Sequence, residues 1–211
     1  MTTVGVIGTG DVGKTLALGF KKHGHAVTIG SREGTKLAAW SAEHGIPEAP
    51  FAGAIAEAEV VVLAVTGSVS ENLVASLGDK LAGKVVIDAT NPIAGPPVQG
   101  ILPFFTGPND SLMERLQAKA PATRFVKAFS CVGAHLMVNP SLPGGTPTMF
   151  ICGDDPAAKE TARGILAQFG WDVEDVGPAA GARAIEPLCQ LWCARGFTKN
   201  QWVHAFALLR A

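Results

Sequence analysis

The sequence predicts an α/β fold, a doubly wound, mostly parallel sheet with helices on both sides. Apolar, β-branched runs alternate with stretches of helical spacing along the 211 residues, which is typical of repeated strand–helix–strand units. The run EVVVLAVTG at 59–67 is almost entirely apolar, as expected of a central strand covered on both faces. This length suits one core, so we expect a single domain over 1–211, with a helical C-terminal appendage over about 182–211.

The first predicted strand covers 3–8 and leads through a glycine-rich turn into a helix at 14–24. The segment PEAPFAGAIAEA at 47–58 predicts a short strand and a short helix. The other predicted strands cover 25–31, 59–67, 84–92, 124–130, 147–155 and 171–177, and the other predicted helices cover 35–45, 68–83, 111–121, 156–170 and 182–210. The Pro- and Gly-rich stretch at 93–110 is the long irregular segment, and such loops are more often functional or mobile than simple connections.

Composition argues against several classes of partner. The 17 basic and 18 acidic residues give a net charge of −1 without a long basic stretch, so we expect no nucleic-acid partner. The N-terminus lacks the regions of a signal peptide, and the longest apolar run, 60–65, is too short to cross a bilayer, so we expect a cytoplasmic protein without a membrane partner.

The cysteines, which are Cys131, Cys152, Cys189 and Cys193, show no CxxC spacing, and the histidines form no ligand pair. Buried thiols and no metal site are therefore favoured over a metal or redox pair.

The loop GTGDVGKT at 8–15 satisfies two phosphate-binding patterns. As G-x-G-x-x-G, it uses Gly8, Gly10 and Gly13 for a tight turn, a close backbone approach to a pyrophosphate and helix–strand packing. As a P-loop, it would use Lys14 and Thr15 for phosphates and magnesium, with the carboxylate of Asp88 as a partner. The dinucleotide interpretation is favoured, because Gly10 has a role only in that motif and the loop lies between a predicted strand and a predicted helix.

The stretch VTIGSRE at 27–33 indicates which dinucleotide binds. NAD-binding proteins carry an Asp or Glu roughly 20 residues after the glycine motif, where it holds the ribose hydroxyls. Here glycine (Gly30) and Ser31 occupy the predicted strand end, which leaves room for a 2′-phosphate, and Arg32 and Lys36 can supply charge to it. Glu33 lies beyond the strand and is interpreted as the start of the next helix. The pattern therefore favours NADP over NAD.

The stretches at 8–33, 84–92, 125–137, 152–162 and 176–188 resemble, in the same order, the family of NADP-dependent oxidoreductases of the deazaflavin coenzyme F420. This family is related to the cytoplasmic domain of STEAP-type metalloreductases. The resemblance implies that Thr9, Gly10, Asp11 and Val12 bind the pyrophosphate, and that Ser31, Arg32 and Lys36 bind the 2′-phosphate. It further implies that the nicotinamide half lies beside Ala64, Val65, Thr66, Ala89, Thr90, Asn91 and Pro92, with the hydride acceptor near Ser130, Cys131, Val132, Gly133 and Ala134.

The resemblance implies hydride transfer between NADP(H) and F420, or a flavin such as FMN or FAD. Two features of the sequence agree with this reaction. Tyrosine is absent, which excludes the Tyr-x-x-x-Lys reductases, and no dedicated acid–base pair stands out, which fits transfer between two stacked rings. The alternatives are a small imine- or pyrroline-type NADPH reductase, a non-catalytic NADPH sensor and, least favoured, a P-loop protein.

A few further residues are candidates near the predicted site. His135 is a candidate proton donor, although a structural or surface role is favoured for it. Asn91 could bind ribose or nicotinamide, or simply form a turn before Pro92. Phe104, Phe105 and Met137 could wall the acceptor pocket or pack in the core. The last helix carries an apolar face, which indicates a possible homodimer; its residues are Leu188, Leu191, Trp192, Phe206 and Leu209.

Overall fold

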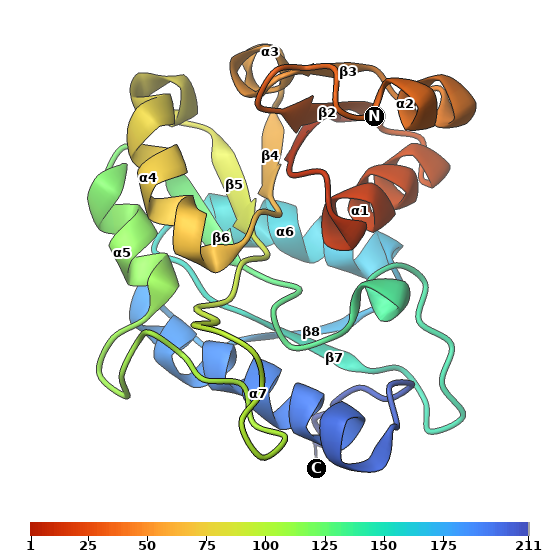
Figure 1. Cartoon of the computed structure of the whole chain (residues 1–211), viewed down its shortest axis with the longest axis vertical. Helices are drawn as coiled ribbons and strands as arrows, with labels where there is room; N and C mark the ends of the chain where they lie inside the picture. The colour runs from red at the N-terminus through yellow and green to blue at the C-terminus, as the bar shows by residue number, and fades with distance from the viewer. Residues whose placement is uncertain (211) are drawn as a thin grey trace.

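The computed structural model describes residues 1–210 and contains a six-stranded parallel sheet. Its strands are β1 (Thr3–Ile7), β2 (Ala26–Ser31), β3 (Glu48–Pro50), β4 (Val60–Leu63), β5 (Val85–Asp88) and β6 (Arg124–Lys127). Their order is β3-β2-β1-β4-β5-β6, so the chain builds one half of the sheet and then crosses over to build the other (Figure 1). The predicted doubly wound sheet is confirmed, and its switch point lies between β1 and β4.

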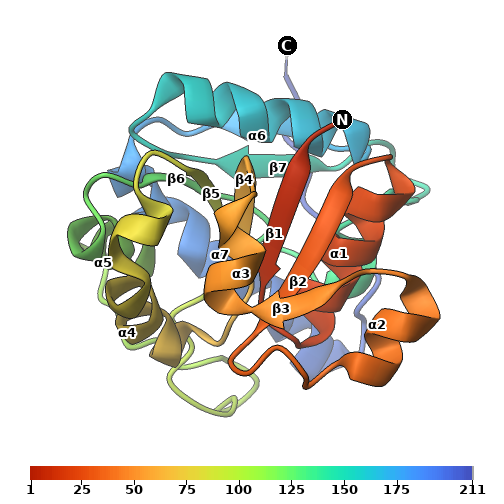
Figure 2. The ribbon, with the colours of Figure 1, turned by 90° about the horizontal axis from the view of Figure 1, so that it is seen from above.

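Helices cover both faces of this sheet (Figure 2). On one face lie α1 (Asp11–Lys22) and α6 (Pro156–Gln168), and on the other lie α3 (Phe51–Ala56), α4 (Gly67–Leu77) and α5 (Leu112–Lys119). Strand residues alternate between the two cores: Val60 and Val62 belong to the first, whereas Val61 and Leu63 belong to the second. Because both sets are apolar, the strand appears in the sequence as one continuous apolar run.

Local signals set several helix ends. The hydroxyl of Ser111 caps α5 by accepting from the N–H of Glu114, and the carboxylate of Asp155 caps α6 by accepting from the N–H of Ala158. The short helix α2 (Ala38–His44) ends at Gly45, whose φ of 57° is the left-handed conformation that glycine adopts without strain. Three short 3-10 turns complete the helical elements: η1 (Gly78–Leu81), η2 (Ala134–Leu136) and η3 (Ala179–Gly181).

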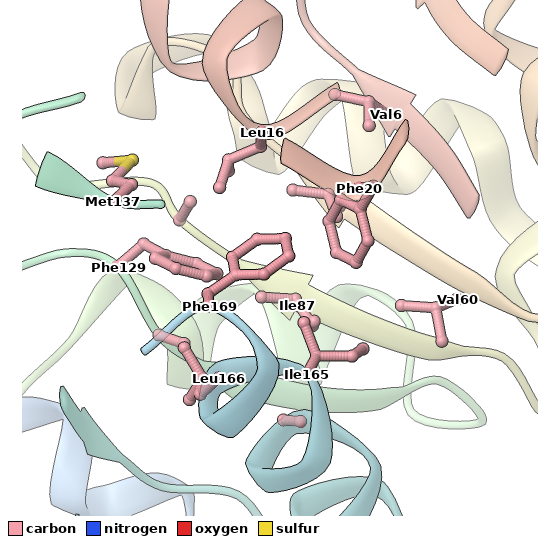
Figure 3. Close-up of a cluster of buried hydrophobic side chains, with 14 of the residues drawn as sticks. Val6, Leu16, Phe20, Val60, Ile87, Phe129, Met137, Ile165, Leu166 and Phe169 are labelled. Atoms are coloured by element: carbon pink, nitrogen blue, oxygen red, sulfur yellow. The ribbon is translucent and has the colours of Figure 1, made fainter. Parts of the chain in front are cut away.

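The core between the sheet and the α1–α6 layer is closed by three phenylalanines (Figure 3). The ring centroids of Phe20, from α1, and Phe169, which follows α6, lie 4.9 Å apart, and those of Phe129 and Phe169 lie 6.2 Å apart. The Phe20–Phe169 pair is edge-to-face, an arrangement that contributes beyond the area that the rings bury. Met137 is also buried in this core, at 3% exposure, as the packing alternative expects.

The last two strands form a separate sheet. Strands β7 (Thr148–Ile151) and β8 (Asp172–Asp175) pair in parallel around the crossover through α6. This pair joins the main sheet through one antiparallel bridge, in which the N–H of Lys127 donates to the carbonyl of Cys152 at 2.9 Å. The β7–β8 pair is thereby attached at the end of β6.

The last helix, α7 (Ala182–Lys199), is shorter than predicted and passes below the sheet in the view of Figure 1. Residues 200–210 are irregular, because Asn200 takes a left-handed conformation (φ 50°) and ends the helix. The indole of Trp192 then donates to the carbonyl of His204 at 2.7 Å, which holds the returning segment. The expected apolar face is divided, since Trp192 is buried whereas Leu191 is 60% exposed, and the homodimer stays a prediction.

The cysteines are free thiols, and Cys131, Cys152 and Cys189 are buried, as the sequence predicted. Burial raises the pKa of Cys131 to about 11 and that of Cys152 to about 12, so both are uncharged at neutral pH. Within residues 1–210, no cluster of three or more His, Cys, Asp or Glu side chains is arranged to hold a metal ion. None of the helices in that range combines the length and apolar character needed to cross a membrane.

Candidate functional site

A cavity of about 980 Å³ lies at the carboxyl edge of the sheet, beside the switch point. Three separately predicted segments meet in its wall: the turn after β1, the end of β2 with the residues that follow it, and the segment after β4. The predicted residues that line it are Gly8, Thr9, Gly10, Ser31, Arg32, Lys36, Ala64, Val65 and Thr66. Open α/β sheets bind ligands at this position, outside the carboxyl ends of the strands.

Glycine occupies the three positions of the first turn for different reasons. Gly8 has a φ of 136°, and a Cβ there would lie 2.1 Å from the carbonyl oxygen of Ala64. A Cβ on Gly13 would lie 2.2 Å from the carbonyl oxygen of Gly8, so both positions require glycine for the fold. Gly10 differs, because a Cβ there would meet nothing within 4 Å. The space beside Gly10 is therefore available to a ligand that approaches the backbone.

The same turn presents the N-terminus of α1. Gly10 is the N-cap residue, and no side chain caps the helix. The first-turn N–H groups, which belong to Asp11, Val12 and Gly13, are thus available to an anion, and the helix dipole favours negative charge there. These three residues do not line the cavity itself. The arrangement fits a pyrophosphate group.

At the end of β2, the position that faces the cavity is Ser31, not Gly30. A Cβ on Gly30 would lie 2.9 Å from Cδ1 of Ile7 and 3.1 Å from Cβ of Ala54, so this glycine faces the core under α3. The interpretation of Gly30 as the vacancy left by the missing acid is therefore wrong. Strand side chains alternate in direction, which gives that place to Ser31. Its Oγ accepts from the N–H of Gly34 at 2.9 Å, so its own hydrogen is free to be donated.

Arg32, Glu33 and Lys36 are exposed and line the mouth of the cavity. The expectation that Glu33 begins the next helix is wrong, because α2 begins only at Ala38. The tight turn closed by Ser31 keeps Glu33 beside the two cations instead. One carboxylate therefore shares the pocket with two positive side chains, and the local formal charge stays positive.

Sequence reasoning missed the wall that faces these cations. Phe51 comes from the start of α3, and Val69, Asn72, Leu73 and Ser76 come from α4. The α4 residues follow the spacing i, i+3, i+4 and i+7, so they share one helix face. The sequence signal that could have revealed this wall is the pair of polar residues, Asn72 and Ser76, on an otherwise apolar helix face.

Of the two segments expected beside the nicotinamide half, 64–66 lines this cavity, whereas 89–92, which follows β5, lies outside its lining. The segment expected beside the hydride acceptor, 130–134, follows β6 and also lies outside the lining. Thr90 is buried, and Asn91 is half-buried, with its amide donating to the carbonyl of Ser130 at 3.0 Å. Ala89 and Pro92 are likewise buried. In the acceptor segment, Ser130, Cys131 and Val132 are buried, and Gly133 and Ala134 are half-buried. These assignments stay predictions.

Lys127, Asp88 and Glu186 form a buried ionic group. The sequence did not show that these three residues would meet. The ammonium of Lys127 lies 2.9 Å from a carboxylate oxygen of Asp88 and 3.0 Å from one of Glu186. Burial opposes the charge of Lys127, but the attraction of the two carboxylates outweighs it and raises the pKa of this lysine. Lys127 is therefore charged at neutral pH.

Two other candidates make contacts within the protein. His135 is exposed, and its Nε2 lies 3.1 Å from the carbonyl oxygen of Trp202, so it helps to fasten the C-terminal segment. The 93–110 segment folds back on itself, with the N–H of Ala94 donating to the carbonyl of Pro103 at 2.8 Å. The guanidinium of Arg115 lies over the ring of Phe105 from this segment. The Arg115 Cζ atom is 5.6 Å from the centroid of that ring.

The P-loop interpretation is wrong on two structural grounds. Helix α1 begins at Asp11, so only Thr9 and Gly10 separate Gly8 from the helix, and Lys14 lies inside it. Asp88, the proposed magnesium partner, is fully buried and paired with Lys127. Neither side chain is placed to hold a magnesium–nucleotide complex.

Comparisons with known proteins agree with this geometry. Residues 3–92 match the family model "NADP oxidoreductase coenzyme F420-dependent". The F420-dependent NADP reductase of Methanothermobacter thermautotrophicus is 30% identical over 196 residues, covering 87% of this chain and 84% of that protein. A crystal structure from Arthrobacter sp. FB24, described provisionally as an F420-dependent NADP-reductase, superimposes with a TM-score of 0.92 at 33% identity, covering all of both chains.

Metalloreductase STEAP3 of Rattus norvegicus is 31% identical over 187 residues. The match covers 88% of this chain but only 36% of that protein, so the chain corresponds to about a third of the metalloreductase.

The strand order, the switch-point cavity and the glycine turn define a protein of the Rossmann class, which binds dinucleotides at this edge of the sheet. Within that class, the chain belongs to the F420-dependent NADP oxidoreductase family.

Proposed function

We propose that this chain binds NADP(H) in the switch-point cavity and transfers hydride between its nicotinamide ring and the deazaflavin ring of F420, with a flavin as the alternative acceptor. The observation that carries the proposal is the end of β2, where a serine and two cations take the place of the carboxylate that selects NAD. Family membership supports the same chemistry.

The residues of the cavity and the adjoining start of α1 bind and orient the cofactor. The N–H groups at the start of α1 bind the pyrophosphate, while the Ser31 hydroxyl and the Arg32 guanidinium bind the 2′-phosphate. The apolar side chains of Phe51, Val69 and Leu73 form a wall for the adenine. When bound, NADPH supplies a hydride, and one further proton from solvent balances reduction of the acceptor ring. The protein then needs to align two rings and exclude water, which requires no acid–base pair.

The acceptor is tested by stopped-flow oxidation of NADPH in the presence of F420, FMN, FAD or a ferric chelate. We expect F420 to give the fastest oxidation. Tight NADPH binding without turnover of any acceptor would instead indicate a sensor, and turnover of a cyclic imine would indicate an imine reductase. Magnesium-dependent ATP binding would contradict the cofactor assignment itself.

Glu33 provides a more specific prediction about cofactor affinity. Replacing Glu33 with glutamine removes the one negative side chain among the charged residues that line the cavity, so NADPH should bind more tightly. An exposed charge pair is worth about 1 kcal/mol or less, which limits the gain to roughly fivefold. Titration with NADPH and NADH measures it, and the gain for NADH should be smaller because NADH lacks the 2′-phosphate.

The matched control is Glu43→Gln on α2. The Glu43 side chain is 75% exposed and does not line the cavity. This variant should leave both affinities unchanged. An equal gain from both variants would mean that Glu33 acts only through overall charge.

A further inference from the structure

The ammonium of Lys127 uses all three of its hydrogens inside the protein. It donates to the carbonyl oxygen of Thr90 at 2.6 Å, and it pairs with Asp88 at 2.9 Å and with Glu186 at 3.0 Å. The Lys127 and Asp88 side chains are fully buried, and that of Glu186 is 2% exposed. A lysine ammonium has three donors, so this group is saturated.

Every oxygen of the two carboxylates has a partner as well. One oxygen of Asp88 accepts from the N–H of Thr90 at 2.9 Å and from its hydroxyl at 2.6 Å. Glu186, from α7, accepts from the N–H groups of Leu112 and Met113, at 3.0 and 3.1 Å, where α5 begins. The positive end of α5 helps to offset the second negative charge. The group therefore joins β5, β6, α5 and α7.

Stability alone is a poor explanation for this group. Burying three charges costs desolvation energy that their attraction only partly returns, and well-packed apolar side chains of similar volume often stabilise a protein as much or more. Phe125 and Ile185, which are close in the chain to Lys127 and Glu186, belong to an apolar core cluster, so an apolar replacement would suit the site. Buried ionic groups can instead fix one backbone arrangement, which here is the turn that follows β5.

The turn that the group fixes lies between the two strand ends. Thr90 is held by its N–H, its hydroxyl and its carbonyl. The next residue, Asn91, places its backbone carbonyl against Gly67, where a Cβ would lie only 1.9 Å away, and its amide donates to the carbonyl of Ser130. The Asn91 Oδ1 and Ser130 Oγ atoms have no partner within residues 1–210. The ends of β5 and β6 are thus held in a fixed arrangement. Within the described residues, the Asn91 Oδ1 and Ser130 Oγ atoms keep hydrogen-bonding capacity that a ligand can use.

A dinucleotide that crosses the switch point must extend from the cavity toward this turn, because Gly67 directly follows Thr66 in the cavity wall. We propose that Lys127 is a positioning residue for the nicotinamide half of the cofactor: by holding the carbonyl of Thr90, it keeps Asn91 and Ser130 in the arrangement against which the ring end packs. This inference rests on the proposed function. Lys127 itself does not touch the cofactor.

The variant that tests this inference must avoid a buried unpaired charge. Lys127→Met alone leaves two carboxylates without a counter-charge and is expected to fold poorly. The triple variant Lys127→Met/Asp88→Asn/Glu186→Gln removes all three charges. The amide oxygen introduced at position 88 can still accept from the N–H and the hydroxyl of Thr90. The amide introduced at position 186 has one oxygen for two N–H groups, so the variant loses the bond to the Thr90 carbonyl and one of the two bonds to the start of α5. The matched control is Lys84→Met, because Lys84 also donates to backbone carbonyls, those of Ala56 and Ala58, but at the opposite edge of the sheet.

Calorimetry compares the affinities for NADP⁺ and for 2′-phospho-ADP-ribose, which lacks the nicotinamide ring. We expect the triple variant to bind the fragment like the wild type, whereas the preference for NADP⁺ over the fragment falls by about threefold or more. With F420 as acceptor, single-turnover hydride transfer should fall roughly 10- to 100-fold, because misplaced reacting rings transfer slowly. The Lys84 variant should change neither quantity.

An unchanged preference for NADP⁺ would overturn the inference, and so would a parallel loss of affinity for NADP⁺ and the fragment, which is the result of a purely structural role. A wild type that does not prefer NADP⁺ over the fragment would overturn it too. If the wild-type protein prefers NADP⁺ but transfers no hydride to F420 or a flavin, the proposed acceptor is wrong, while the binding comparison still decides the role of Lys127.

Discussion

Replacing Gly10 with alanine is expected to abolish tight NADPH binding and to leave the fold intact. The added methyl group meets no protein atom within 4 Å, so it enters only the space that a pyrophosphate would occupy. Displacing the pyrophosphate by this much breaks at least two hydrogen bonds to a charged group, each worth about 1.5 to 3 kcal/mol, so affinity should fall by at least about 100-fold. Alanine is a poorer N-cap than glycine, but the cost to stability should stay near or below about 1 kcal/mol.

Gly13→Ala is the informative comparison, because its Cβ would lie 2.2 Å from the carbonyl oxygen of Gly8. This variant should lower the unfolding temperature as well as the affinity, since the turn itself must move. Thermal unfolding and NADPH titration of both variants separate the two effects. If the Gly10 variant bound NADPH as the wild type does, the pyrophosphate could not lie at this turn.

The fold was predictable because its main signals are local. The strands β1, β2, β4 and β5 of the central sheet are short, mainly apolar runs, and the turn at Gly8–Gly13 has fixed spacing. The separate pairing of β7 with β8 was not predictable in the same way, because partner choice depends on how distant segments pack. The end of α7 was also missed. Apolar residues continue to Leu209, but from Asn200 on the segment is irregular, and only some of its apolar residues, among them Trp202 and Phe206, pack against the core.

The site residues were likewise predictable where the sequence signal is local, and not where it depends on contacts between distant segments. The cavity residues from the turn after β1 and from the end of β2 were found because the motif places them at known distances along the chain. Lys127 and Asp88 were not recognised as partners, although they face each other across β5 and β6, because the strand order was not known from the sequence. Glu186 joins them from a helix far along the chain, and no local pattern signals such a contact.

Replacing Arg32 with alanine should reduce the preference for NADPH over NADH, because the lost guanidinium acts only on the 2′-phosphate. A hydrogen bond to a charged group is worth about 1.5 to 3 kcal/mol, so NADPH affinity should fall roughly 10- to 150-fold while NADH affinity stays within about twofold. Lys22→Ala, at the far end of α1, removes one positive charge away from the cavity and should leave the ratio unchanged.

The exposure of Arg32 gives this prediction a second, independent measurement. An ion pair at the mouth of a cavity is screened by salt, so the NADPH preference of the wild type should decline between low and high ionic strength. The Arg32→Ala variant should show a weaker decline, because only Lys36 remains to interact with the phosphate. A variant with unchanged preference and unchanged salt dependence would place the 2′-phosphate away from the end of β2, and the selectivity for NADP would then need another origin in the cavity.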